Sequence, residues 1–192
     1  MVCCHPMKKD IFVSPSSKGE CGLYDMRRGG SGNKLMTPIS SLVGHTKAIS
    51  SALFSPLSGS RVVTVAYDNK LRLFDTTSCL DTSLQPLKSI PHNNQTGRWL
   101  TTFKVCTSGN NSIWALHYVP CFFKAEWHPM SDEMFFVGSM NQPRQIDVYT
   151  VSGKHYNLKG EDLGSVCSIV KCHPTQDIVV GGNSSGRVHV FM

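Results

Sequence analysis

An arginine and an aromatic residue stand side by side in a polar, glycine-containing stretch near the middle of the chain. Arg98 and Trp99 follow Gly97, and Lys104 comes shortly after them. An aromatic ring can stack on an unpaired base while a guanidinium meets a backbone phosphate. Arg98 and Trp99, with Lys104 nearby, therefore predict contact with DNA. The alternative is that Trp99 packs into the fold and that Arg98 is a solvated surface charge.

A second pair of charged residues is suited to holding a protein partner. Asp25 and Arg27 follow an apolar stretch that ends at Tyr24, with one residue between them. A fixed carboxylate can orient a guanidinium, whose fork then meets backbone carbonyls or a carboxylate of another protein. The same pattern also arises as a purely structural pair, so both interpretations stay open.

Motifs that would carry catalysis are missing from the sequence. It contains no nucleophile elbow, no phosphate-binding loop and no zinc-protease motif. The eight cysteines include no C-x-x-C pair. A metal cluster of Cys3, Cys4, His5 and Cys21 is conceivable, but zinc sites usually show paired ligands, and buried reduced thiols are the alternative. We therefore expect a protein that is not an enzyme and that uses no cofactor and no metal.

Composition is that of an ordinary globular domain. The chain has 192 residues, of which 40% are hydrophobic and 17% charged, so one domain is expected. No apolar run approaches the roughly 18 residues of a membrane helix, and no secretory leader precedes the first strand. We expect an intracellular protein with no membrane contact. The net charge of +6 permits nucleic acid as a partner, although such an excess can also serve solubility alone.

The chain repeats itself. Four segments share an anchor that ends in proline, and two strand-like apolar runs follow each anchor: His5-Pro6, Phe54-Ser55-Pro56, Trp127-His128-Pro129 and Cys172-His173-Pro174. The second run ends on an aromatic residue in every copy: Tyr24, Phe74, Tyr149 and Phe191. The anchor prolines are 50, 73 and 45 residues apart. A period of about 40 to 50 residues built from short strands predicts the blades of a β-propeller.

The long interval of 73 residues contains a segment that does not fit this pattern. Without residues 105–124 the interval would shrink to 53. We interpret 105–124 as an atypical insertion, such as a splicing product. The alternative is a functional loop that exposes Trp114 and Tyr118.

One stretch carries a family resemblance. Gly44-His45, a predicted strand over 48–54, Asp68 and a predicted strand over 71–75 resemble one complete repeat of the WD40 family, with Phe74 where that family prefers tryptophan. The resemblance implies an all-β WD40 β-propeller in which His45, Thr64 and Asp68 form a hydrogen-bonded bracing network. Phe74 has no indole N–H to complete it.

Counted as WD40 repeats, residues 1–192 begin inside one repeat, contain two whole ones and end at the third strand of another. That is about half of a seven-bladed ring, an incomplete propeller that exposes the faces of its terminal blades. We expect a fragment of a longer protein.

Two local segments resemble parts of specialised WD40 proteins. The stretch over 23–27 is similar to the WDxR box of WD40 substrate receptors in cullin-4 ubiquitin ligases, with Tyr24 in place of tryptophan. This implies that Asp25 and Arg27 dock the ligase adaptor, which is the large subunit of the damaged-DNA-binding complex. The stretch over 90–104 resembles a loop in the smaller subunit of that complex, where a hairpin tip wedges into the lesion; Gly97, Arg98 and Trp99 match the tip by position.

A wider resemblance, over 42–50, 54–59, 97–100 and 181–187, is to a nuclear branch of the WD40 family. It implies a nuclear adaptor that binds DNA, takes part in the DNA-damage response and serves as a substrate receptor of a cullin-4 RING ubiquitin ligase, with other chromatin proteins as partners. The alternative is a protein-interaction scaffold that does not bind DNA and reaches chromatin only through its partners.

Overall fold

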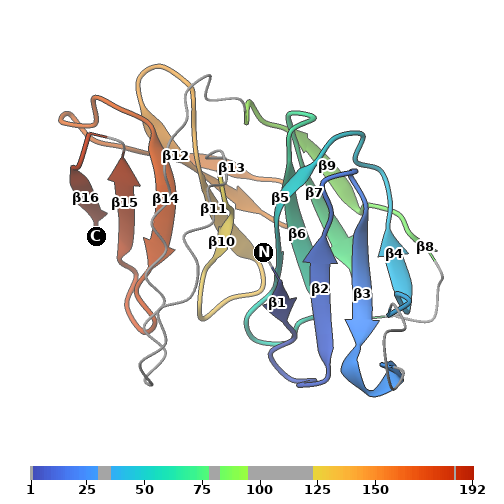
Figure 1. Ribbon diagram of the computed structural model, residues 1–192. Helices are drawn as coiled ribbons and strands as arrows, with labels where there is room; N and C mark the ends of the chain where they lie inside the picture. The colour runs from blue at the N-terminus through green and yellow to red at the C-terminus, as the bar shows by residue number, and fades with distance from the viewer. Residues whose placement is uncertain (1, 30–35, 78–82, 95–122, 184) are drawn as a thin grey trace.

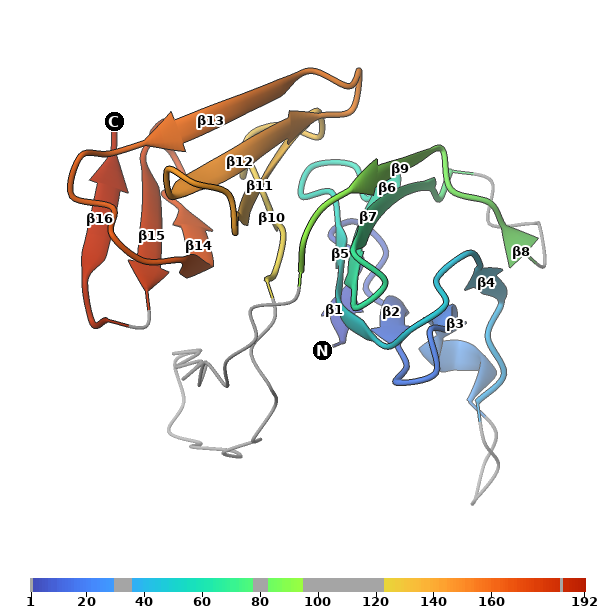
Figure 2. The same cartoon turned by 90° about the horizontal axis from the view of Figure 1, so that it is seen from above.

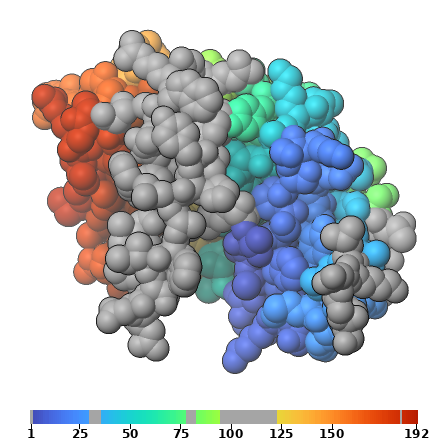
Figure 3. All heavy atoms as spheres, in the orientation of Figure 1, coloured from blue at the N-terminus to red at the C-terminus, as the bar shows by residue number. Residues whose placement is uncertain are grey.

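The computed structural model describes residues 2–29, 36–77, 83–94, 123–183 and 185–192. They form four β-sheets that stand next to one another in chain order (Figure 1). Seen from above, the sheets follow an open arc (Figure 2). The first sheet, in blue, and the fourth, in red, lie at opposite sides of the molecule (Figure 3). The prediction of an all-β, incomplete β-propeller is confirmed.

The first two sheets are built from the strands before residue 92. The first contains β1 (Cys3–Cys4), β2 (Ile11–Pro15), β3 (Cys21–Asp25), β4 (Ser40–Leu42) and β8 (Ser83–Leu84). The second contains β5 (Ile49–Phe54), β6 (Arg61–Ala66), β7 (Lys70–Asp75) and β9 (Lys88–Pro91). A single 3-10 turn, η1 (Met26–Arg28), follows β3.

The other two sheets come from the chain after residue 125. The third contains β10 (Glu126–Trp127), β11 (Met134–Gly138), β12 (Gln145–Thr150) and β13 (His155–Lys159). The fourth contains β14 (Cys167–Cys172), β15 (Val179–Asn183) and β16 (Val188–Phe191). Each sheet is one blade. The fourth blade has three strands within the described residues, in line with the expected end at a third strand.

The expected count of two whole repeats differs from what the strands build. Within the described ranges three blades have four strands or more, because the short strand β4 pairs with β3 and completes the first blade. The first blade also gains β8, which comes from the connection between β7 and β9 and pairs with β4 in parallel, Ser41 opposite Ser83. Nothing in the repeat pattern predicts β8.

Neighbouring blades pack face to face through three apolar cores. Val13 and Leu23 of the first blade meet Ala52 and Phe74 of the second. Val63 and Leu73 meet Phe135 and Tyr149 between the second and third blades. Phe136 and Ile146 meet Val170 between the third and fourth. Because the second blade is covered on both faces, β6 is apolar along almost its whole length instead of alternating. Each blade therefore buries its apolar face by packing against its neighbour.

The two edges of the arc differ in the loops they carry. We call one edge the anchor rim; it holds the turns that begin at Pro6, Pro56, Pro129 and Pro174, and it is the lower edge in Figure 1. The opposite edge, the hairpin rim, holds the β2–β3, β6–β7, β11–β12 and β15–β16 turns and the connections that enter β5, β10 and β14. Binding residues on different rims therefore face different partners.

Within the described ranges, no helix is long and apolar enough to cross a membrane. In the same part of the chain, no three His, Cys, Asp or Glu side chains are grouped to hold a metal ion. Cys21 is buried, and this burial raises the pKa of its thiol to about 12. His5 is otherwise engaged, because its Nδ1 accepts the backbone N–H of Met7 and Lys8 at 3.1 and 3.0 Å.

Candidate functional sites on the two rims

Asp25 and Arg27 form a closed pair on the anchor rim. The Asp25 carboxylate caps the 3-10 turn by accepting the backbone N–H of Arg27 at 3.0 Å. It also accepts from Nε and Nη2 of the Arg27 guanidinium at 3.0 and 2.8 Å. These hydrogen bonds lower the pKa of Asp25 to about 2. The Arg27 side chain is 68% exposed, so the donors that Asp25 leaves unused are accessible from solvent.

Tyr24, the third residue predicted for adaptor docking, does not join this pair. Successive side chains on a strand point to opposite faces, and the ring of Tyr24 stacks on Phe12 with centroids 5.2 Å apart. This contact lies on the outer face of the first blade. The structure brings Asp25 and Arg27 together and places Tyr24 elsewhere.

His45, Thr64 and Asp68 meet in the second blade. His45 Nδ1 lies 3.0 Å from the Asp68 carboxylate, and its Nε2 lies 2.7 Å from the Thr64 hydroxyl. Arg72 also donates to Asp68 at 2.7 Å, which the sequence interpretation missed. Burial lowers the pKa of His45, which keeps the ring neutral. Phe74 is fully buried in the adjoining core.

The residues predicted to contact DNA, Gly97, Arg98, Trp99 and Lys104, lie outside the described residues. The chain leaves the hairpin rim toward them through His92, Asn93 and Asn94. Asn94 is pinned to the second blade, since its side chain donates to the Ala66 carbonyl at 2.8 Å. Its backbone N–H also donates to Asn69 Oδ1 at 3.2 Å.

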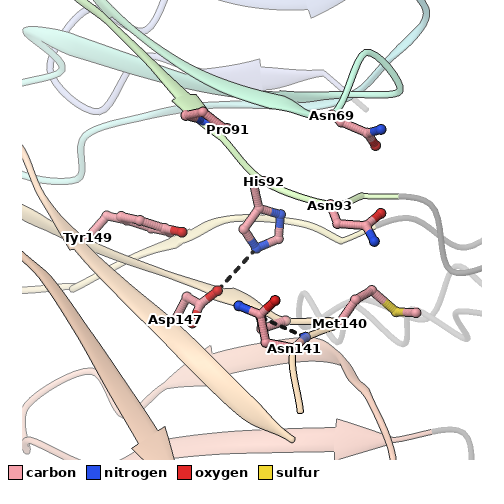
Figure 4. A pocket seen from close by; sticks show the side chains of 9 residues that line it. Asn69, Pro91, His92, Asn93, Met140, Asn141, Asp147 and Tyr149 are labelled. Carbon is pink, nitrogen blue, oxygen red and sulfur yellow. Dashed lines mark hydrogen bonds and ion pairs between the residues drawn. The ribbon is translucent and has the colours of Figure 1, made fainter. Parts of the chain in front are cut away.

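A pocket of about 280 Å³ lies beside this point, between the second and third blades (Figure 4). Its lining includes His92 and Asn93 from one side and Asp147 and Tyr149 from β12 on the other. Asp147 is 1% exposed. Burial alone would raise the pKa of its carboxyl, but hydrogen bonds, among them that from Gln145 Nε2 at 2.6 Å, outweigh burial and lower it.

The predicted insertion 105–124 lies outside the described residues except at its end. Phe123 is fully buried in the core between the second and third blades. Its ring meets that of His92 edge-on, with centroids 5.4 Å apart, and its carbonyl accepts the Ser50 hydroxyl at 3.2 Å. The fold therefore uses at least this residue of the segment.

Two curated relatives align with almost the whole of this chain. The chain is 42% identical over 190 residues to WD repeat-containing protein 76 of Xenopus laevis, which covers 97% of the chain and 28% of that protein. The protein of the same name in Mus musculus is 42% identical over 193 residues, which are 98% of this chain and 26% of that protein. The chain belongs to the WD40-repeat family. No protein-family model matches it.

A more distant relative is DNA damage-binding protein CMR1 of Kluyveromyces lactis. It is 33% identical over 144 residues, which are 75% of this chain and 23% of that protein. The protein of that name in Phaeosphaeria nodorum is 27% identical over 203 residues, 98% of this chain and 34% of that protein. The chain thus spans between about a quarter and a third of the length of these curated relatives.

The WD40 pattern also explains which site residues sequence reasoning missed. Arg72 and Asp147 each stand two residues before the aromatic that ends its blade's third strand, Phe74 and Tyr149. Arg72 contacts His45, and Asp147 contacts His92. Each histidine lies in the connection that enters the first strand of that blade. In the sequence, each appears as a charged residue inside an apolar run. A strand residue that faces solvent gives the same pattern, so the pattern alone does not identify a buried site residue.

Proposed function

We propose that the chain is part of a WD40 protein that binds DNA through its hairpin rim in the DNA-damage response. The observation that carries the proposal is the charge of this rim on the first two blades, where Lys18, Lys47 and Lys70 are exposed and Glu20 is the exposed acid. Lys47 and Lys18 come close, because the backbone of Lys47 lies against Gly19. The names of the CMR1 relatives, DNA damage-binding proteins, support the same conclusion.

In this proposal the lysines position the DNA backbone and Arg98 with Trp99 contact the bases. Phosphate contacts dominate affinity and make it salt-dependent, whereas stacking on an aromatic ring depends little on sequence. Gly97 and Lys104 complete the contact segment. Asp68 does not oppose this field, since its carboxylate is neutralised by Arg72.

Fluorescence anisotropy of a labelled duplex, undamaged and lesion-bearing, tests the proposal with the full chain at several salt concentrations. Changing Lys18, Lys47 and Lys70 to glutamine should weaken binding and lower the salt slope by up to about 3. The matched control changes Lys8, Lys9 and Arg28 on the anchor rim to glutamine, which removes the same charge. If both triple variants bind equally, the hairpin rim is not the DNA surface.

We further propose that Asp25 and Arg27 dock a cullin-4 ligase adaptor, so that the protein works in the nucleus as a substrate receptor. Asp25 orients the guanidinium of Arg27 outward, which supports this role. A pull-down with the purified large subunit of the damaged-DNA-binding complex tests it. Arg27→Ala should abolish capture and Arg28→Ala, the exposed neighbour, should not.

The rival function is a scaffold that reaches chromatin only through protein partners. It predicts that changing Arg98 and Trp99 together to alanine leaves DNA binding unchanged and weakens a protein complex. The proposed DNA contact predicts the reverse, so the same double variant separates the two functions.

A further inference from the structure

A large apolar side chain is exposed directly after the anchor proline in three consecutive blades of the anchor rim. Met7, Leu57 and Met130 each follow an anchor proline directly. Their exposed fractions are 71%, 53% and 47%. The corresponding residue of the fourth blade is the polar Thr175. We call Met7, Leu57 and Met130 the apolar row.

The three turns that carry the apolar row touch one another. The His5 ring fills the space where a Cβ on Gly59 would lie, which joins the first turn to the second. The backbone N–H groups of Leu57 and Ser58 donate to the Asp132 carboxylate, each at 2.9 Å, which joins the second turn to the third. The row therefore runs along a continuous edge whose backbone is held by contacts between blades.

Charges along the same edge are unequally compensated. Asp10 lies 3.5 Å from Arg27 and Glu133 lies 2.5 Å from Arg61, and Asp132 accepts hydrogen bonds from the second turn. Asp177, 3.2 Å from His128, is exposed at the far end of the edge, in the fourth blade. Lys8, Lys9 and Arg28 are exposed, and no ion pair among the described residues includes them. The surface around the apolar row thus offers positive charge to a partner.

We propose that the apolar row is a docking site for an acidic amphipathic helix of a partner protein. Packed sheets lie about 10 Å apart, and a helix rises about 1.5 Å per residue, so apolar side chains at positions i, i+7 and i+14 on one helix face match the three blades. Carboxylates on its flanks would meet Lys8, Lys9 and Arg28. Methionine suits such a surface because its unbranched, polarizable side chain adapts to different partners. This site is distinct from the DNA surface, which lies on the hairpin rim, and does not depend on it.

DNA fits the row less well than an acidic helix does. Phosphates would pair with the three basic side chains, but DNA offers nothing to cover apolar side chains at the backbone. Only the helix would gain free energy by burying the exposed apolar side chains. The experiment must therefore distinguish binding of DNA from binding of an acidic helix.

The test uses the full chain with 13C-labelled methionine methyl groups and an 18-residue synthetic peptide that has leucines on one face and glutamates on the other. Titration should shift the Met7 and Met130 methyl signals and leave that of Met140, in the β11–β12 turn of the hairpin rim, unchanged. Changing Met7, Leu57 and Met130 to serine should weaken binding, read by anisotropy of the labelled peptide, at least tenfold. Leu87→Ser, at a residue that is 59% exposed and outside the row, is the control.

Two further peptides decide the role of charge. The same peptide with lysine in place of glutamate should not bind, and a scrambled acidic peptide should bind at least tenfold more weakly. Equal binding of the acidic and basic peptides, a triple variant that binds like the parent, or competition by duplex DNA at the Met7 and Met130 methyl groups would overturn the proposal. Circular dichroism of each variant shows that the fold is kept; if the triple variant unfolds, the methyl shifts of the parent chain still decide the result.

Discussion

His92 Nε2 lies 3.5 Å from the Asp147 carboxylate, across the boundary between the second and third blades. The other ring nitrogen of His92 faces Asn94 Oδ1 at 2.6 Å, and that amide is oriented by its donation to the Ala66 carbonyl. Both ring nitrogens therefore face oxygen atoms. The base of the segment that leads to Arg98 is held by contacts to both blades.

Removing the acidic partner of this pair should destabilise the fold. Asp147→Asn replaces the buried carboxylate that accepts from Gln145 and faces His92, so we expect the free energy of unfolding to fall by about 1 to 3 kcal/mol. Urea denaturation followed by tryptophan fluorescence measures this. Asp162→Asn, at an exposed position, should change it by less than about 0.5 kcal/mol. Equal effects of the two would show that the pair contributes nothing.

Acid should destabilise the chain in two steps. His45 has a lowered pKa in the fold, so its neutral form stabilises the protein above the unfolded pKa of about 6.5, and this contribution is lost as pH falls toward the folded pKa. Asp68, Asp132 and Asp147 also have lowered pKa values, so their contribution is present above about 3.9 and is lost below it. Urea midpoints between pH 7.5 and 3 measure both steps, and His45→Gln should remove the upper one only.

Gly59 should tolerate alanine far less well than Gly186 does. Both have positive φ, 67° and 78°, so both substitutions strain the backbone by about 1 kcal/mol. At Gly59 the new Cβ would also meet the His5 ring, whereas nothing lies within 4 Å of one at Gly186. We expect Gly59→Ala to cost at least about 1 kcal/mol more. Thermal unfolding of the two variants gives the difference, and equal melting temperatures would contradict the close packing of the first two turns.

Alkylation should distinguish the thiol of Cys4 from those of Cys21, Cys167 and Cys172. Cys4 is exposed, whereas burial raises the pKa of Cys21 and of Cys172 to about 12 and that of Cys167 to about 11. The thiolate is the reactive form, so these three should alkylate slowly at pH 7.5 in the folded chain. Brief treatment with N-ethylmaleimide and mapping of tryptic peptides reads each site. Fast modification of Cys21 would contradict its placement in the core.

Deleting residues 105–124 should preserve the fold. The deletion joins Phe103-Lys104 to Ala125 and so replaces Phe123-Lys124 with the same two residue types. Phe103 can then fill the buried position of Phe123. We expect a melting temperature within a few degrees of the parent. A loss of cooperative unfolding would show that the segment has a structural role of its own.

Residue patterns in the sequence were sufficient to predict the blades but not all of their connections. The anchor prolines and the aromatic residues at the ends of third strands indicate the inner strands of each blade. These strands have recognisable sequence patterns because they are packed on both faces. β4 and β8 are only three and two residues long, too short to show a period. Asp25 and Arg27 were paired correctly by their spacing, since the contact is local. The contact of His92 with Asp147 joins positions 55 residues apart, which no local pattern signals.

The parallel pairing of β8 with β4 ties the two N-terminal blades together. The connection that leaves β7 crosses to the outer edge of the preceding blade before it returns as β9. The first blade cannot open at that edge without releasing a segment of the second, so the two should unfold as a single cooperative unit. In hydrogen exchange, the amides of β3 and β7 should then share one opening free energy, while β14 to β16 exchange on their own.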